Sequence, residues 1–194
     1  MNPIDWPIYL PKKAFPPYSF VGGHWPHPSK DRGGHSYGVK EGDIAPLSSD
    51  SWWVNSTYLF AIDLFNHGYY WEAHEQWEQL WIKAGRQGQD GQMLKGLIKL
   101  SAAAIKIRQH RRKGVTIHSQ RALDIWQSFL DANCGVYWCG LKLERLIALS
   151  QSLKVLDDSS FDPTLPVERV YPIPLVLHFP YGSKPQTTSQ QSIL

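Results

Sequence analysis

The sequence has few cysteines and no long hydrophobic run, and each absence excludes a class of protein. Two cysteines among 194 residues, Cys134 and Cys139, cannot build the disulfide framework of a small secreted domain. No stretch approaches the roughly 18 apolar residues that a membrane-spanning helix needs. The first residues, MNPIDWPIYLPKK, lack the basic and then apolar order of an export signal. We therefore expect a soluble, cytoplasmic protein with no membrane partner.

Proline is missing from the middle of the chain. All 14 prolines lie outside residues 47–162. Because proline breaks helices, a proline-free block between two proline-rich arms predicts a helical body. We expect an all-α fold, a compact bundle of about four to five helices with a non-helical N-terminal arm rich in proline and aromatic residues. The predicted divisions are an arm over 1–50 packed on the body, a helical domain over 51–155, an extended segment over 156–182 and a disordered tail over 183–194.

Hydrophobic periodicity and glycines place the helices within this body. A loop is expected over 85–91 and a helix break at Gly114, while Gly96 falls inside a helical pattern, where close packing is the expected reason. The body shows no strand-like alternation. The predicted helices cover about 54–66, 69–84, 92–112, 116–132 and 141–153.

Charge and aromatic content leave several partners open. The formal net charge is +3, and aromatic residues make up 13%, including nine tryptophans, which is too apolar for a disordered chain. A tryptophan-lined groove could hold a small molecule or a peptide, or could serve a homo-oligomer interface. A basic cluster at the end of one helix suits a solvated helix C-terminus. Nucleic-acid binding through this cluster is a further alternative function, which is disfavoured because no nucleic-acid motif accompanies it. The basic cluster consists of Lys106, Arg108, Arg111, Arg112 and Lys113.

The segment 64–81, LFNHGYYWEAHEQWEQLW, concentrates the polar chemistry of the chain. At about 100° per residue, His74 falls in one sector with large aromatic side chains, and Glu78 follows it by one turn. Glu72 and Glu75 lie one turn apart on the more polar side. The candidate binding residues of this sector are Tyr70, Trp71, Trp77 and Trp81.

An imidazole and a carboxylate among tryptophan rings favour three interpretations. Such groups can act as general acid and base in a small hydrolase-type enzyme, with His74, Glu75, Glu78 and Glu72 as the catalytic candidates. His74 and Glu78, with Glu75, could instead hold a divalent metal as the cofactor. In the third interpretation the cluster is a packing network in a non-catalytic binding or structural module. The spacing is not that of a zinc-protease helix.

This segment, followed by LKGLIKLSAAAIKIRQH, resembles the domain of unknown function 309 family over about 58–132. The resemblance implies an all-helical fold and no assigned reaction, and Lys99 stands where the family pattern has glutamine. The positions that match the family motif are Leu64, Phe65, Asn66, Gly68, Tyr70, Glu72, Ala73, His74, Glu75, Glu78 and Trp81.

The N-terminal arm is also more aromatic than a disordered linker would be, so we expect it to be ordered and docked on the helices. Its histidines, His24, His27 and His35, suggest that the arm covers the His74 face. His24 and His27 are then weaker candidates for metal ligands. The alternative is that the arm merely covers apolar surface.

Overall fold

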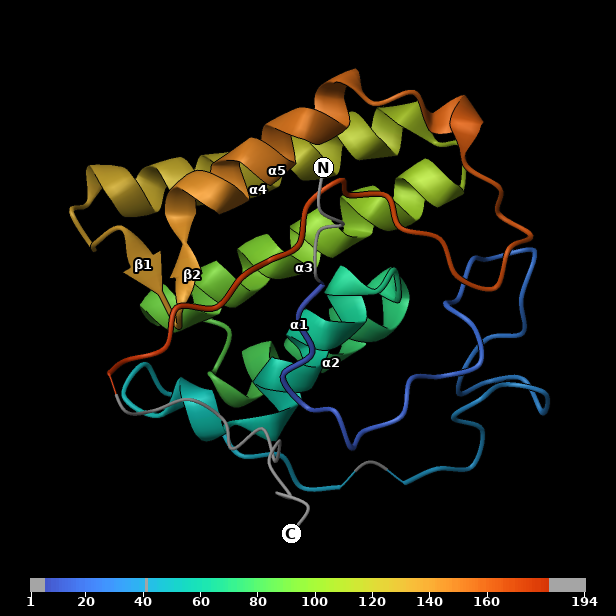
Figure 1. Cartoon of the computed structure of the whole chain (residues 1–194), viewed down its shortest axis with the longest axis horizontal. Coiled ribbons are helices and arrows are strands. Elements are labelled where there is room, and N and C mark those ends of the chain that lie inside the picture. The colour runs from blue at the N-terminus through green and yellow to red at the C-terminus, as the bar shows by residue number, and fades with distance from the viewer. Residues whose placement is uncertain (1–5, 41, 182–194) are drawn as a thin grey trace, which may run out of the picture.

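Five α-helices run through residues 6–40 and 42–181, the part of the chain that this computed structural model describes. They confirm the predicted all-α fold, and the predicted tail over 183–194 lies outside the described residues. In Figure 1, α3 passes through the middle of the molecule, with α1 and α2 on one side and α4 and α5 on the other. The helices are α1 (Ser56–Asn66), α2 (Tyr70–Lys83), α3 (Gly88–Arg108), α4 (Arg112–Asp131) and α5 (Leu143–Val155).

The turn between α1 and α2 depends on a glycine. Asn55 caps α1 by accepting the Tyr58 N–H at 2.9 Å. Gly68, which follows α1, has a φ of +91°, and a Cβ there would lie 2.9 Å from the carbonyl oxygen of Glu168. Both the left-handed backbone and the close approach of the C-terminal segment therefore require glycine. This turn fixes where α2 begins, at Tyr70.

The first four helices end in the same Schellman closure, in which the two residues after the C-cap return their N–H groups to the last turn. The left-handed residue of α3 is His110, with a φ of +50°, so the break falls there and not at the predicted Gly114, which lies inside α4. Because the sequence prediction placed helix ends at glycines, it did not find this histidine. The left-handed residues that follow the C-caps of these four helices are Gly68, Gly85, His110 and Asn133.

α3 is the centre of the core because α2 and α4 both pack against it. A Cβ on Gly96 would lie 2.2 Å from Cη2 of Trp126, so the indole of α4 occupies the space that a side chain would need. α3 begins at Gly88, so the predicted 85–91 loop is partly helical. Its 21 residues include a lysine face, and no helix among the described residues is long and apolar enough to cross a membrane.

A small antiparallel hairpin interrupts the helices before α5. Strands β1 (Tyr137–Trp138) and β2 (Leu141–Lys142) pair with Tyr137 opposite Lys142 and Trp138 opposite Leu141. Two residues per strand are too few to show alternation, which is why the sequence pattern misses them. After α5 the chain crosses in front of α3 in Figure 1, and Leu177 forms a bridge with Leu141.

The N-terminal arm contacts α1 and the C-terminal segment through backbone N–H groups and the Tyr9 hydroxyl. The Asp63 carboxylate on α1 accepts the N–H groups of Tyr9 at 2.7 Å and Leu10 at 2.8 Å. The Leu177 N–H donates to the Tyr9 hydroxyl at 2.8 Å, and the Ser19 N–H donates to the Pro166 carbonyl at 2.7 Å. These bonds place the arm over the α1–α2 hairpin.

Candidate functional site

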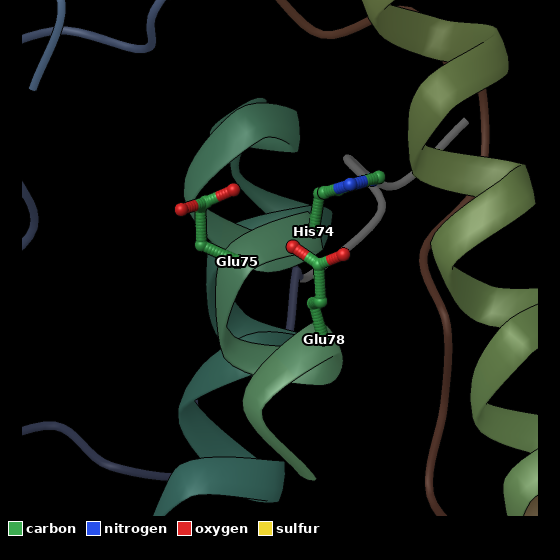
Figure 2. A group of neighbouring side chains, drawn as sticks. All are labelled: His74, Glu75 and Glu78. Atoms are coloured by element: carbon green, nitrogen blue, oxygen red, sulfur yellow. The ribbon is translucent and has the colours of Figure 1, made fainter. Parts of the chain in front are cut away.

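The middle of α2 brings together three of the predicted site residues. His74, Glu75 and Glu78 are all partly buried, and one ligand atom from each lies within 4.8 Å of the others. Figure 2 shows the Glu78 carboxylate extending along α2 towards the His74 ring, with Glu75 on the adjoining side of the helix. Among the described residues this is the cluster of three or more histidine, cysteine or acidic side chains whose geometry could hold a metal ion.

The His74 ring is oriented by the neighbouring helix. Its Nδ1 lies 3.2 Å from the carbonyl oxygen of Ile98 on α3. Because a carbonyl oxygen only accepts, Nδ1 carries the proton and Nε2 carries the lone pair. Burial lowers the pKa of His74, and this effect outweighs the nearby Glu78, which raises the pKa. The ring is therefore neutral at pH 7, with one nitrogen available as a ligand or base.

Cationic side chains of α3 and α4 surround this cluster. The pKa of Lys99 on α3 is lowered first by burial and then by Arg121 and Lys95, while Glu78 raises it. His118 on α4 has a pKa lowered to about 4 by burial and by neighbouring cations, among them Lys99. Its buried Nδ1 has no hydrogen-bond partner within residues 6–40 and 42–181. The site thus combines two carboxylates and two neutral imidazoles with lysine and arginine groups.

His118 is a residue that the sequence argument missed. It stands four positions before Ala122, which begins the apolar stripe that continues through Trp126 on α4. Extending that stripe by one turn would have placed His118 against α3. The predicted helix over 116–132 includes His118, but only its apolar residues from Ala122 onward were assigned to the buried face.

Glu72 lies apart from this cluster because it turns towards the N-terminal arm. Its Oε1 accepts the Phe20 N–H at 2.9 Å and lies 3.2 Å from Nε2 of His35. Both side chains of the Glu72–His35 pair are only 8% exposed. The motif therefore points its polar side chains in two directions, with Glu72 towards the arm and His74 towards α3.

The other arm histidines do not join His74. The His27 ring packs near Phe20, with centroids 5.0 Å apart, and near Trp71 at 5.7 Å. His24 follows a turn in which its N–H donates to Val21. Neither belongs to the cluster on α2, so the structure does not bring together the wider ligand set that the sequence suggested.

The four predicted aromatic binding residues fall into two groups. Tyr70 and Trp77 are 1% and 0% exposed and belong to the core. Burial raises the pKa of Tyr70 to about 12, and its neutral hydroxyl accepts the Val170 N–H at 2.7 Å. Trp71 and Trp81 are partly buried, and the Trp71 ring stacks on the His74 ring at 6.0 Å. Trp71 and Trp81 are thus the aromatic residues left near the surface of α2.

Two members of the basic cluster are used inside the fold. Arg108 is 1% exposed and donates to the carbonyl oxygens of Asp162 at 3.1 Å and Leu165 at 2.6 Å. Arg112 donates to the carbonyl groups at the end of α5, among them Leu156 at 2.8 Å. These guanidinium groups hold the end of α5 and the segment that follows it.

The fold and the site define a helical-bundle protein whose α2–α3 pair carries a half-buried histidine–glutamate cluster. Residues 58–117, from α1 into the start of α4, match the model of a family described as "Domain of unknown function (DUF309)". This match confirms, over the segment that it covers, the resemblance seen in the motif. No curated protein and no solved structure matches the chain.

Proposed function

We propose that this protein binds a divalent transition-metal ion, such as Zn²⁺, through His74, Glu75 and Glu78. The observation that carries the proposal is the convergence of one imidazole and two carboxylates within 4.8 Å on two successive turns of α2. Ligands at about 2.0–2.2 Å from a tetrahedral ion lie roughly 3.4 Å apart, so rotation of the glutamate side chains would be enough to close the site. Nitrogen and oxygen donors of this kind suit zinc, manganese and iron.

The orientation of His74 supports the same proposal. Metal-bound histidines commonly donate their second ring N–H to a carbonyl or carboxylate, which fixes the tautomer and strengthens the ligand nitrogen. The Nδ1 contact with the Ile98 carbonyl at 3.2 Å meets that requirement and leaves Nε2 as the ligand. The lowered pKa of His74 favours the neutral ring that a metal needs.

Three protein ligands leave coordination positions for water and substrate, which is the arrangement of catalytic metal sites. A metal in such a site lowers the pKa of bound water and polarises a carbonyl or phosphoryl oxygen, the chemistry of a hydrolase. Lys99 on α3 would then orient an anionic part of the substrate, and neutral His118 could accept a proton. We therefore favour a hydrolase-type role for the cluster.

The test is metal binding by the whole chain. Protein freed of metal with a chelator is titrated with Zn²⁺, Co²⁺ and Mn²⁺ while its melting temperature and the Co²⁺ absorption spectrum are recorded. We expect a stoichiometric rise in melting temperature for the native chain and its loss in His74→Asn, whose amide can still donate to Ile98. Glu144→Gln, which alters an exposed carboxylate paired with Lys142, should keep the response. Equal responses in the native chain and His74→Asn would refute the metal site.

A packing network is the second candidate, and the contact between His74 and Ile98 favours it because it ties α2 to α3. In that case no metal would bind, and Glu78→Gln would lower the free energy of unfolding by disturbing the interaction between Glu78 and Lys99. Two results together would refute the packing network. The native chain would bind a metal that Glu78→Gln does not bind, and the metal-free variant would melt at the same temperature as the metal-free native chain.

A further inference from the structure

A cavity of about 660 Å³ lies between the N-terminal arm, the start of α1 and the outer face of α2. Its size falls within the range of small-molecule binding sites. Its wall includes Phe60 and Trp71 as aromatic surfaces, and Glu72 and Glu75 one turn apart on α2. This cavity adjoins the proposed metal site through Glu75, whereas His74 and Glu78 do not line it.

Glu72 gives this cavity a buried charge with spare hydrogen-bonding capacity. Its side chain is 8% exposed, and Oε1 already receives the Phe20 N–H and faces His35. Oε2 is buried and has no hydrogen-bond partner within the described part of the chain. A buried carboxylate oxygen that accepts no hydrogen bond is unfavourable. We therefore expect a bound molecule to supply the missing donor.

The wall already stabilises one cation. The Lys13 ammonium, at the edge of the cavity, lies 3.9 Å from the centroid of the Phe60 ring. Aromatic faces attract ammonium and guanidinium groups, and carboxylates form their strongest hydrogen bonds with such charged donors. The other acidic side chain of the wall, Asp43, is paired with Lys83 at 2.8 Å. The buried carboxylate oxygen available to a ligand is therefore Oε2 of Glu72, beside Trp71.

We propose that this cavity binds a small organic cation, an ammonium or guanidinium group on an apolar body. The charged group would donate to Glu72, and the apolar body would lie against Trp71. The ligand is thus recognised by one buried carboxylate and one ring, with the arm residue His35 holding the carboxylate in place.

Isothermal titration of the full chain with phenethylamine tests the proposal, in phosphate buffer because amine buffers would compete. Phenethyl alcohol is the uncharged matched probe. We expect saturable binding of the amine and none of the alcohol. Glu72→Gln should weaken binding by about ten-fold or more, since it removes the charge of the acceptor. Glu144→Gln, which alters an exposed carboxylate outside the cavity, should bind like the native chain.

Gln76→Trp provides a second variant, because it fills the cavity from α2 and leaves Glu72 unchanged. Its loss of phenethylamine binding, with an unchanged circular dichroism spectrum, would support the cavity even if Glu72→Gln failed to fold. The proposal is overturned if the native chain shows no saturable binding at millimolar amine, if the alcohol binds equally well, or if Gln76→Trp binds like the native chain.

Discussion

His35 of the N-terminal arm lies 3.2 Å from Glu72 of α2, although 37 positions separate them in the sequence. Since a carboxylate only accepts, Nε2 of His35 carries the proton in this contact, while Nδ1 lies 2.9 Å from the Ser36 hydroxyl. One glutamate of the motif thus holds the arm in place, and it does so from inside a cavity wall.

Replacing Glu72 by alanine should loosen the arm. The Phe20 N–H would lose its acceptor and His35 its partner, so we expect the free energy of unfolding to fall by about 1–3 kcal/mol. His35→Ala leaves the Phe20 bond intact and should cost less, about 1 kcal/mol or below. Urea unfolding measures both changes, and limited proteolysis should cut the arm faster in Glu72→Ala. Equal cleavage of variant and native chain would contradict this role.

Gly96→Ala should disrupt the contact between α3 and α4. The added Cβ would lie 2.2 Å from the Trp126 ring, so the helices must separate, at a cost of about 1–3 kcal/mol. Gly114→Ala is the comparison, because its Cβ would lie 2.8 Å from Cγ of Lys106, a single side chain that must shift, while alanine is the better helix former; we expect a smaller loss than for Gly96→Ala. Thermal unfolding of the two variants compares them directly, and a Gly96→Ala protein as stable as Gly114→Ala would show that the packing is looser than described.

Arg112→Ala should destabilise the end of α5, whereas Arg111→Ala should not. The Arg112 guanidinium donates to the carbonyl oxygens of Leu153 at 3.2 Å and Leu156 at 2.8 Å, and its loss should cost about 1–2 kcal/mol. Arg111 is exposed, so its removal should stay within about 0.5 kcal/mol. Chemical denaturation distinguishes them, and equal effects would mean that Arg112 acts as an ordinary surface charge.

Titration of the Asp63 carboxyl group should make the free energy of unfolding depend on pH. Burial raises its pKa to about 6, although the Tyr9 and Leu10 N–H groups act in the opposite direction. The unfolded value is about 3.9, so between these two values the folded chain binds a proton that the unfolded chain releases. The contribution of Asp63 to the free energy of unfolding therefore increases as pH falls from 6 to 4, by at most about 3 kcal/mol.

Asp63→Asn provides the reference for that measurement, because its amide does not titrate. The free energy of unfolding of the native chain, minus that of Asp63→Asn, should be larger at pH 4.5 than at pH 7.5. Chemical denaturation of both proteins at the two pH values measures this difference. A constant difference between the two proteins at both pH values would show that the carboxylate titrates normally.

The sequence predicted the helices well because their signals are local. Periodicity marked α3, and the loop predicted from residue 85 marked the end of α2. The end of α3 at His110 was not predicted, since a histidine in the left-handed conformation follows no common sequence pattern. The short hairpin at 137–142 was missed because it has too few residues to alternate.

For the candidate site, spacing on one helix was enough to group His74 with Glu78 and Glu75. The helical wheel does not show which aromatic rings are buried in the core. In the structure Tyr70 and Trp77 are buried, whereas Trp71 lies near the surface. The pairing of Glu72 with His35 depends on how the arm crosses α2, which no local pattern encodes. His118 comes from a helix whose register against α3 is set by the contact of Gly96 with Trp126.

The hydrogen bond from the Leu177 N–H to the Tyr9 hydroxyl spans 168 positions and joins the two ends of the described chain. Contacts of such sequence separation carry a large loop-closure cost and form slowly compared with helical hairpins. During synthesis the helices can assemble before residue 177 is made, and Asp63 and Glu72 can already bind the arm at that stage. The bond between Tyr9 and Leu177 should therefore form in the last folding step and fix the arm against the C-terminal segment.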